Sequence, residues 1–577
     1  MQEELITLGI LFFFALIGGI LASRFKQPLI MGLLLVGAVI GPKALGIIHN
    51  ESIMGTMIDF GSILILFVIG LEFDISKLTK IGLKAIFIAV LNSAILTFVG
   101  FCISLALGFS VYASLFMGVI MAFGSTVVIV KVLENKGYMD RQEVPLLIAI
   151  LIIEDIIAVI IITFFSGIQN KATGLLGNIE NIIIAMCALV IIYIAFTKFV
   201  KPLLEWIVRG NNSEEIITFM SLAMCAGFSF ISSYLGLSPA VGAFLAGSIV
   251  ASLPNAKEFQ KSIEPYNLII SAFFFIAIGT MIDFNAIMQN IMIILILVLA
   301  VIIIKITAFS SIIYFFANMK GEKMFFSSIA MFSIGEFSLL VAKESVNFNI
   351  GIDLISISAA IIAISAVIMS IAIGYSDRIY EPTMDKLPWK MKKGMERMSN
   401  YIRSISDELD LESKHSRSLK KHVIHLVVSL VAILLALSGW KKLIGIVGTA
   451  DSTLIYVVTG VIVSALLVYA FYNARNCMRI LGEIFSNATG TRDAKHSRTM
   501  IIRAFLALGL MMGGILFPFV MFLFNMHASY IYISFIMIAL SVWQLYKISK
   551  AANHDTHEQT FTSHHFDTTR HHNGWRM

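Results

Sequence analysis

Two adjacent acidic residues, Glu154 and Asp155, stand in the middle of an otherwise apolar run at 144–167. An ionised carboxylate at that depth in a membrane costs on the order of a few kcal/mol unless it is paired, hydrated or bound to a cation. Neighbouring helical residues point about 100° apart, so both carboxyls cannot face one partner equally. Two nearby carboxyls also titrate as a coupled pair, and their oxygens are hard ligands, which favours alkali cations over softer metals. We therefore expect a site at which a proton and a cation compete; the alternative is a structural salt bridge between helices.

Lys305 lies near the middle of another long apolar run, at 289–317. An unpaired ammonium group at that depth is also costly, so Lys305 is the expected counter-charge for one of the two acids. The alternative is that its side chain reaches a membrane interface, but the residue is far from either end of the run. An acid bonded to this lysine at rest could be released when a cation arrives.

Two further apolar runs are interrupted by glycine and polar residues. The interruptions read Phe123-Gly124-Ser125-Thr126 and Ser333-Ile334-Gly335-Glu336. Unwound helix at such a point exposes carbonyl groups and half-helix ends that can coordinate a cation, provided that they face a cavity. The simpler alternative is that these small residues only allow neighbouring helices to pack closely. We expect the hydroxyls of Ser125 and Thr126 at the ion site, with Glu336, Gly124 and Gly335 as secondary candidates.

The elements that position these residues are predicted to be membrane helices. The chain has 577 residues, of which 58% are hydrophobic and 14% charged, and its mean hydropathy is +0.90. A soluble protein could not cover that much apolar surface, whereas apolar runs of about 20 residues match the thickness of a bilayer. We predict an all-α polytopic membrane protein with thirteen spans within 4–375 and about four more within 422–546. The four cysteines are scattered and show neither disulfide nor metal-ligand spacing.

The distribution of Lys and Arg predicts the orientation of the chain. With the N-terminus outside, the inner loops and span ends of the first thirteen spans hold fifteen basic residues and the outer side holds three. This positive-inside bias predicts a multi-pass protein of the cell membrane whose C-terminal tail is cytoplasmic. The same charges orient helices, so the net charge of +6 does not indicate a nucleic-acid partner.

These observations divide the chain into four parts. They are a transmembrane domain at 1–376, a cytoplasmic linker at 377–421, four additional spans at 422–550 and a His-rich cytoplasmic tail at 551–577. The linker could instead lie on the membrane surface or regulate the first domain. The tail histidines could sense pH or bind divalent metal. A solvated linker and a disordered polar tail are the simpler interpretations.

Three glycine motifs recur at nearly constant spacing, which predicts an internal repeat. The pairs are Gly32-x-x-Leu35-x-Gly37 with Gly242-x-x-Leu245-x-Gly247, Gly70-x-x-x-Asp74 with Gly279-x-x-x-Asp283, and Gly124 with Gly335. Their offsets of 209–211 residues cover seven predicted spans, an odd number, so matching helices cross the membrane in opposite directions. Inverted repeats of this kind are typical of secondary transporters that work by alternating access.

The combined motifs resemble those of the monovalent cation:proton antiporter family that includes the Kef-like and NapA-like exchangers. The residues that carry the likeness are Pro28-Leu-Ile-Met-Gly32, Gly41-Pro42, Phe67-Val-Ile-Gly70-Leu-Glu-Phe-Asp74, Ser125-Thr126, Glu154-Asp155, Leu237-Ser-Pro-Ala-Val-Gly-Ala-Phe-Leu-Ala-Gly247 and Gly335-Glu336-Phe337. The resemblance covers residues 1–376. It implies a thirteen-helix inverted-repeat fold, a mobile core domain beside a dimerisation domain, and elevator-like alternating access.

The resemblance also implies roles for single residues. Asp155 corresponds to the aspartate that carries the ion and the proton, Thr126 lies where broken helices cross, and Lys305 matches the basic residue of a later span. Members that move net charge usually have two aspartates at the pair, whereas electroneutral members have Asn or Gln before the aspartate. Glu154 keeps the acid but lengthens it, which leaves the stoichiometry open and favours electrogenic exchange.

The function expected from the sequence is exchange of Na⁺ or K⁺ for protons by alternating access. A gated cation channel or a sensor-like protein on the same fold is the alternative, and a membrane-embedded enzyme is disfavoured because no nucleophile and base share one depth. We expect no cofactor and no resident metal. Residues 377–577 contain no G-x-G-x-x-G motif after a strand, so a nucleotide-binding regulatory domain is not expected. The remaining expected partners are membrane lipid and a second copy in a homodimer.

Overall fold

The computed structural model describes residues 2–168 except 26, 49, 50, 73 and 74, and residues 214–376 except 236, 237, 254, 320 and 349. It also describes residue 198, short stretches and single positions between 418 and 480, residues 494–544 except 524 and 525, and residue 547. The chain divides into two units, Met1–Ser399 with Ile433–Val461 and Asn400–Ala432 with Ile462–Met577. Apart from residues 418 and 421, the predicted linker and the His-rich tail lie outside the described residues, as does Asp74.

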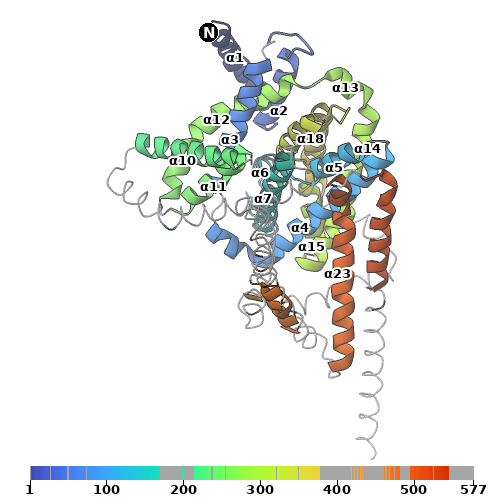
Figure 1. The fold of residues 1–577 in the computed structure, drawn as a ribbon. Coiled ribbons are helices and arrows are strands. Elements are labelled where there is room, and N and C mark those ends of the chain that lie inside the picture. The colour runs from blue at the N-terminus through green and yellow to red at the C-terminus, as the bar shows by residue number, and fades with distance from the viewer. Residues whose placement is uncertain are drawn as a thin grey trace, which may run out of the picture. The chain divides into compact units, whose positions relative to one another are not determined.

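The first unit is a succession of helices in two similar series (Figure 1). The first series comprises α1 (Gln2–Arg24), α2 (Leu29–Ile40), α3 (Glu51–Glu72), α4 (Ile75–Ala106), α5 (Val111–Ile120), α6 (Thr126–Asn135) and α7 (Val144–Ile168). The second comprises α10 (Glu214–Tyr234), α11 (Pro239–Ala251), α12 (Ala256–Thr280), α13 (Phe284–Gln289), α14 (Ile291–Ile304), the π-helical turn η3 (Lys305–Phe309), α15 (Ser310–Phe316), α16 (Glu322–Ala330), α17 (Phe337–Ser345) and α18 (Leu354–Ala372). Short 3-10 turns η4 (Val346–Phe348) and η5 (Ile373–Tyr375) follow α17 and α18.

Eight helices of the described chain are long and apolar enough to cross a membrane. They correspond to α1, α3, α4, α7, α10, α12, the continuous rod of α14 to α15, and α18. The shorter apolar helices α2, α5 and α11 fall on three other predicted spans. The span predicted near 178–200 lies outside the described residues apart from residue 198. The chain is thus an all-helical polytopic membrane protein.

The C-terminal unit contains α23 (Ala494–Leu523), the 3-10 turn η7 (Ala528–Tyr530) and a helix that continues to residue 544. Its described apolar helices, Gly509–Phe522 and Ala528–Gln544, are shorter than a full span. The predicted spans near 422–440 and 453–473 lie largely outside the described residues. The four additional spans therefore stay a prediction.

The glycine pairs found in the sequence form contacts that map onto one another. A methyl group placed on Gly37 of α2 would overlap backbone of α12 near Gly279, and one placed on Gly247 of α11 would overlap backbone of α3 near Gly70. Helix α11 lies about 210 residues after α2, and α12 lies about 210 residues after α3. The contact of α2 with α12 in the first case therefore corresponds to the contact of α11 with α3 in the second. The two halves are thus related by a pseudo-two-fold exchange, which confirms the repeat.

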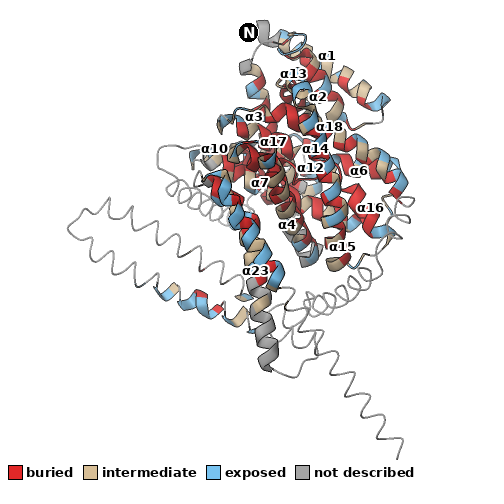
Figure 2. Ribbon diagram, turned by 90° about the vertical axis from the view of Figure 1, so that its right-hand side faces the viewer, coloured by how far each residue is buried: buried red, intermediate tan, exposed pale blue. Residues whose placement is uncertain are grey.

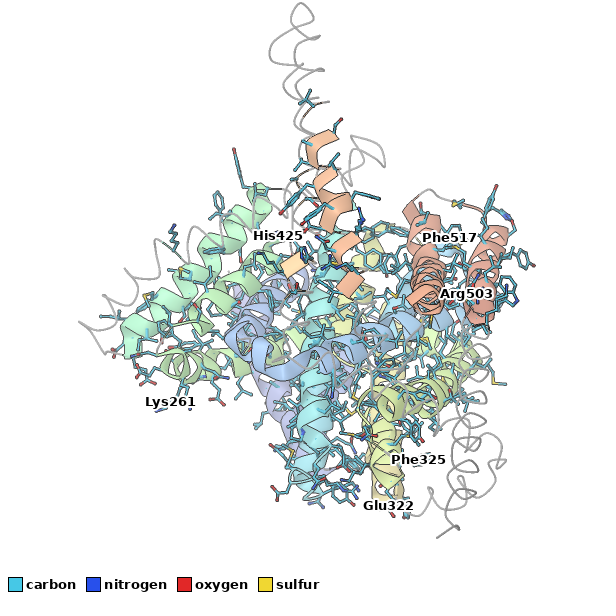
Figure 3. All side chains as sticks on the ribbon, turned by 90° about the horizontal axis from the view of Figure 1, so that it is seen from below. Lys261, Glu322, Phe325, His425, Arg503 and Phe517 are labelled. Carbon is cyan, nitrogen blue, oxygen red and sulfur yellow. The ribbon has the colours of Figure 1, made fainter. Side chains whose placement is uncertain are left out.

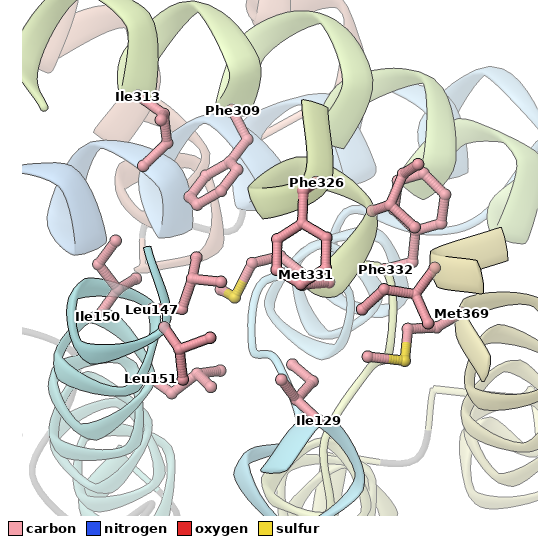
Figure 4. Close-up of a cluster of buried hydrophobic side chains, with 14 of the residues drawn as sticks. Ile129, Leu147, Ile150, Leu151, Phe309, Ile313, Phe326, Met331, Phe332 and Met369 are labelled. Carbon is pink, nitrogen blue, oxygen red and sulfur yellow. The ribbon is translucent and has the colours of Figure 1, made fainter. Parts of the chain in front are cut away.

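Two of the hydrophobic clusters of this unit are built from different helices, and we call each group of helices a body. The first body has its core between α4, α6, α7, α15, α16 and α18, and Figure 4 shows part of it, with Ile129, Leu147, Phe326 and Met369 labelled. The second body is built from α3, α10, α11 and α12, whose buried side chains include Phe67 and Phe228. Figure 2 shows the buried positions concentrated in the helices of this unit, among them α7, α14 and α17.

The glycine contact between α3 and α11 can be tested by adding one methyl group to Gly70. We expect Gly70→Ala to lower the free energy of unfolding by about 1–3 kcal/mol, because the methyl group meets the Phe244 carbonyl group and neither backbone can retreat. The measurement is the melting temperature of the purified protein in detergent. Gly55→Ala is the matched control, since Gly55 is on the same helix and has open space around it. Equal melting temperatures for the two variants would contradict this packing.

Candidate functional site: a crossing of two broken helices

The interruptions predicted in two spans are both present, and they cross each other. The helix of the fifth span ends at Ile120 and resumes at Thr126, and its repeat partner ends at Ala330 and resumes at Phe337. The extended segments between these ends pair through an antiparallel bridge of Gly124 with Ile334. Ser125 N donates to Ser333 O at 3.1 Å and Gly335 N donates to Phe123 O at 3.0 Å. We call this arrangement the crossing.

Glycine is required at the centre of the crossing because the two backbones touch. A Cβ atom on Gly335 would lie 2.5 Å from Gly124 O. A Cβ atom on Gly124 would lie 2.8 Å from a methyl carbon of Leu151 on α7. A side chain on Gly335 would force the two segments apart because it meets backbone, whereas one on Gly124 would displace the end of the Leu151 side chain.

Serine side chains satisfy the helix ends that the break exposes. Ser125 Oγ accepts from Val128 N at 3.2 Å and so caps the start of α6. Ser338 Oγ donates to Ile120 O at 2.6 Å and so caps the end of α5 from the other broken helix. Helix ends inside a membrane need such partners because no lipid group can replace them.

Glu154 is enclosed by hydrogen-bond donors. Its side chain has no exposed surface. Its Oε2 atom accepts from Gly124 N at 3.0 Å, and its Oε1 atom accepts from Asn92 Nδ2 of α4 at 2.5 Å. The carboxyl group thus ties α7 to α4 and to the crossing.

Asp155 faces a different environment, as the 100° step along the helix predicts. It accepts a hydrogen bond from Thr126 Oγ1 at 3.0 Å, at the first residue of α6. Its side chain retains 9% exposure, against none for Glu154. The crossing therefore presents the start of a half-helix and one hydroxyl group to Asp155, which is the more accessible of the two acids.

The other predicted hydroxyl group lies across the crossing from Thr126. Ser125 Oγ donates to Glu336 Oε2 at 2.9 Å, which joins the two repeat halves. Glu336 is partly exposed and immediately precedes α17. The buried hydroxyl of Ser333 has no hydrogen-bond partner among the described residues.

Lys305 lies at the start of the π-helical turn η3, with only 2% of its side chain exposed. Its Nζ atom lies 5.3 Å from the ring centroid of Phe309. Within the described part of the chain its Nζ atom has no hydrogen-bond partner. The structure therefore buries Lys305 without a hydrogen bond to an acid, and its role as a counter-charge stays a prediction. By contrast, the labelled charged residues Lys261 and Glu322 in Figure 3 are exposed.

Two residues that contact the site were not predicted from the sequence. Asn92 is 1% exposed and bonds Glu154, and its signal was a polar residue within the long apolar run of α4. Ser365 of α18 accepts from Ile334 N at 3.1 Å. The repeat offset of 211 residues relates Ser365 to Glu154, so both halves place an acceptor on the corresponding long helix against the crossing.

A crossing of two broken helices, held between exchange-related halves and next to buried acids, defines the class of secondary transporters with inverted repeats. The chain matches the family model described as "Sodium/hydrogen exchanger, transmembrane" over residues 11–375, and it belongs to this family. It is accordingly a monovalent cation/proton antiporter, a transporter rather than an enzyme.

Individual proteins show the same relationship. The chain is 30% identical over 342 residues to "Iron transporter MagA" of Paramagnetospirillum magneticum, which covers 59% of this chain and 78% of that protein. It is 27% identical to a Na(+)/H(+) antiporter of Enterococcus hirae, over 58% of this chain and 87% of that protein. The solved sodium proton antiporter MjNhaP1 from Methanocaldococcus jannaschii superimposes with a TM-score of 0.50 at 18% identity, over 66% of this chain and 98% of that chain. This last likeness shows the fold.

The Thr126 hydroxyl group can be tested without changing its volume. We expect Thr126→Val to raise the apparent KM for the cation about tenfold, since a hydrogen bond to a charged group is removed beside Asp155. The measurement is the cation dependence of exchange in proteoliposomes. Thr163→Val is the control, because that hydroxyl is on the same helix as Asp155 but bonds only its own helix, at Val159 O. An unchanged KM in Thr126→Val would remove Thr126 from the site.

Proposed function

We propose that Asp155 is the residue that carries cation and proton in turn. The observation that carries this assignment is the difference between the two adjacent acids. Glu154 is sealed between two donors and has no exposed surface, whereas Asp155 is buried but retains 9% exposure and accepts a hydrogen bond from the Thr126 hydroxyl at the start of a half-helix. A mobile substrate needs a group that it can reach, and Asp155 is that group.

The chemistry follows from charge at Asp155. The ionised carboxylate and the Thr126 hydroxyl that bonds it offer hard oxygen ligands to Na⁺ or K⁺, and Ser125 is the next residue along the chain. Protonation of the carboxyl group removes the charge that holds the cation, so the two substrates exclude each other. Binding one and releasing the other on opposite sides of the membrane gives exchange.

The oxygen ligands at Asp155 support a monovalent cation as the substrate rather than iron. Iron is the substrate that the name of the Paramagnetospirillum magneticum relative gives for that protein. The part of the chain that the structure describes contains no group of three or more His, Cys, Asp and Glu side chains placed to hold a metal ion. Asp155 instead accepts a hydrogen bond from the Thr126 hydroxyl, an oxygen group that suits a monovalent cation.

The proposed cycle moves the first body, which carries the crossing, relative to the second body. Separate hydrophobic cores support this division. Ion pairs connect the two groups of helices near one end: Lys343 of α17 with Asp59 of α3, and Lys43 after α2 with Asp353 before α18, at 3.5 Å. These charges line a cavity of about 510 Å³ that is shared by both groups. In the proposed orientation, with the N-terminus outside, this is the outer end.

The proposal keeps the remaining expectations from the sequence. The transport domain at 1–376 has thirteen spans, the second body forms a homodimer interface, and residues 377–421, 422–550 and 551–577 form the linker, the additional spans and the cytoplasmic tail. The exposed aromatic residues Phe219, Phe230 and Tyr234 of α10 support a surface of the second body that contacts lipid or a second copy.

The carrier assignment is tested by Asp155→Asn. We expect this variant to lose cation-driven proton movement while remaining folded, since the amide cannot alternate between charge states. Purified protein is placed in liposomes with an internal pH dye, and Na⁺ or K⁺ gradients are imposed. Asp140→Asn, an exposed acid in the loop before α7, is the control and should exchange normally.

Two results would contradict the proposal. Wild-type rates in Asp155→Asn would remove Asp155 as carrier. Cation flux through the unmodified protein without any proton movement would favour the gated channel on the same fold.

The relative motion of the two bodies is tested by a reversible crosslink. We expect a reducible bifunctional thiol crosslinker that joins Asp59→Cys to Lys343→Cys, in a background without Cys102, Cys187, Cys225 and Cys477, to stop exchange until a reductant is added. Such a reagent spans the length of the lysine side chain, which a direct disulfide does not. The control pair Thr218→Cys and Ser262→Cys joins α10 to α12 within the second body, where the two hydroxyls are in contact. Full exchange in the crosslinked Asp59–Lys343 pair would show that this motion is not needed.

A further inference from the structure

Glu154 has no transport step in the cycle described above, although its surroundings are the most completely ordered in the site. Both carboxylate oxygens are engaged by protein donors, Asn92 Nδ2 on one side and Gly124 N on the other. Asn92 is itself buried in the middle of α4, and its side chain has 1% exposure. Burial of this amide group removes its hydrogen bonds to water and so costs free energy, which indicates that the side chain has a role beyond packing.

The chain connectivity lets Glu154 set the position of the carrier residue relative to its neighbour. Gly124, which Glu154 holds, is two residues before Thr126. Asp155, which Thr126 contacts, is the residue after Glu154. A change in the side-chain conformation of Glu154 therefore displaces the start of α6 relative to Asp155, and it alters the distance between the two oxygens that face the cation.

The hydrogen bond from Asn92 leaves Glu154 one conformation. Lys305 has a buried ammonium group without a hydrogen-bond partner in the described structure, so it does not hold Glu154. A Glu154 side chain that lost Asn92 would keep only the Gly124 N–H group as a donor and would be free to change its conformation.

We propose that Asn92 is a positioning residue for cation exchange, which holds Glu154 against the Gly124 N–H group and so fixes Thr126 at the distance from Asp155 that the cation requires. The proposal rests on the role of Asp155 as carrier. The other half of the repeat offers a parallel, since Ser365, which the offset of 211 residues relates to Glu154, accepts the N–H group of Ile334, one residue before the position related to Gly124.

A reciprocal exchange of donor and acceptor tests the hydrogen bond itself. Asn92→Asp places a carboxylate against Glu154, and Asn92→Leu keeps the approximate volume but removes the donor. The double variant Asn92→Asp/Glu154→Gln restores one amide and one carboxylate in reversed positions, and the side-chain carbonyl of the introduced glutamine can still accept from Gly124 N. The net charge of the double variant equals that of the unmodified protein.

We expect Asn92→Leu and Asn92→Asp to raise the apparent KM for the cation about tenfold or more, with a smaller effect on the maximal rate, because the ligands are misplaced rather than removed. The double variant should recover a KM within about threefold of the unmodified protein, as expected for two directly coupled residues. Thr97→Val, at another buried polar position of α4, is the control and should leave both parameters unchanged.

A residue that only fills space would give a different result. The proposal is overturned by an unchanged KM in Asn92→Leu, or by a double variant whose KM stays as high as that of Asn92→Asp. Where the leucine variant does not fold, the comparison of Asn92→Asp with the double variant decides alone. Normal exchange by Asp155→Asn would overturn the carrier assignment, whereas inactive Asp155→Asn with an unchanged KM in Asn92→Leu would overturn only the role of Asn92.

Discussion

Backbone groups that leave a helix inside a membrane must find partners within the protein, and the site is organised around this constraint. The broken helices satisfy part of it by pairing with each other, through the antiparallel contact of Gly124 with Ile334. Side chains supply the remainder: Ser338 takes the last carbonyl of α5, and Glu154 takes the N–H group of Gly124. The hydrogen bonds that repair the break also fix the start of α6, where the Thr126 hydroxyl group donates to Asp155.

The two halves of the repeat satisfy these backbone groups with different side chains. The exchange relation places Ser365 where the first half has Glu154, and both accept a backbone N–H group of the crossing. Ser125 and Glu336 are also related by the repeat, and they bond each other across the centre. The scaffold is therefore symmetric, while the side chains at related positions differ, with an acid in one half and a serine in the other at both pairs.

Much of this site could be predicted from residue types and spacing. The acids within an apolar run marked Glu154 and Asp155, and the common repeat offset marked Gly124 and Gly335 as partners before any contact was known. The hydrogen bond of Asn92 was not predictable, because it depends on how α4 packs against α7 rather than on any local pattern. The same reason applies to Lys305, whose depth was evident but whose distance from each acid was set by a π-helical turn that hydropathy does not reveal.

That turn has a wider consequence for the helix that contains it. A π-turn inserts one residue into a helical rod, so every later side chain is rotated by about 100° relative to an uninterrupted helix. Leu297 and Val301 before the turn and Phe309 and Ile313 after the start of the turn are all buried. The extra residue therefore sets the register in which the second part of the rod packs, without a loop. Insertion or deletion of one residue at this point would rotate every later side chain about the helix axis, although it would leave the hydropathy profile almost unaltered.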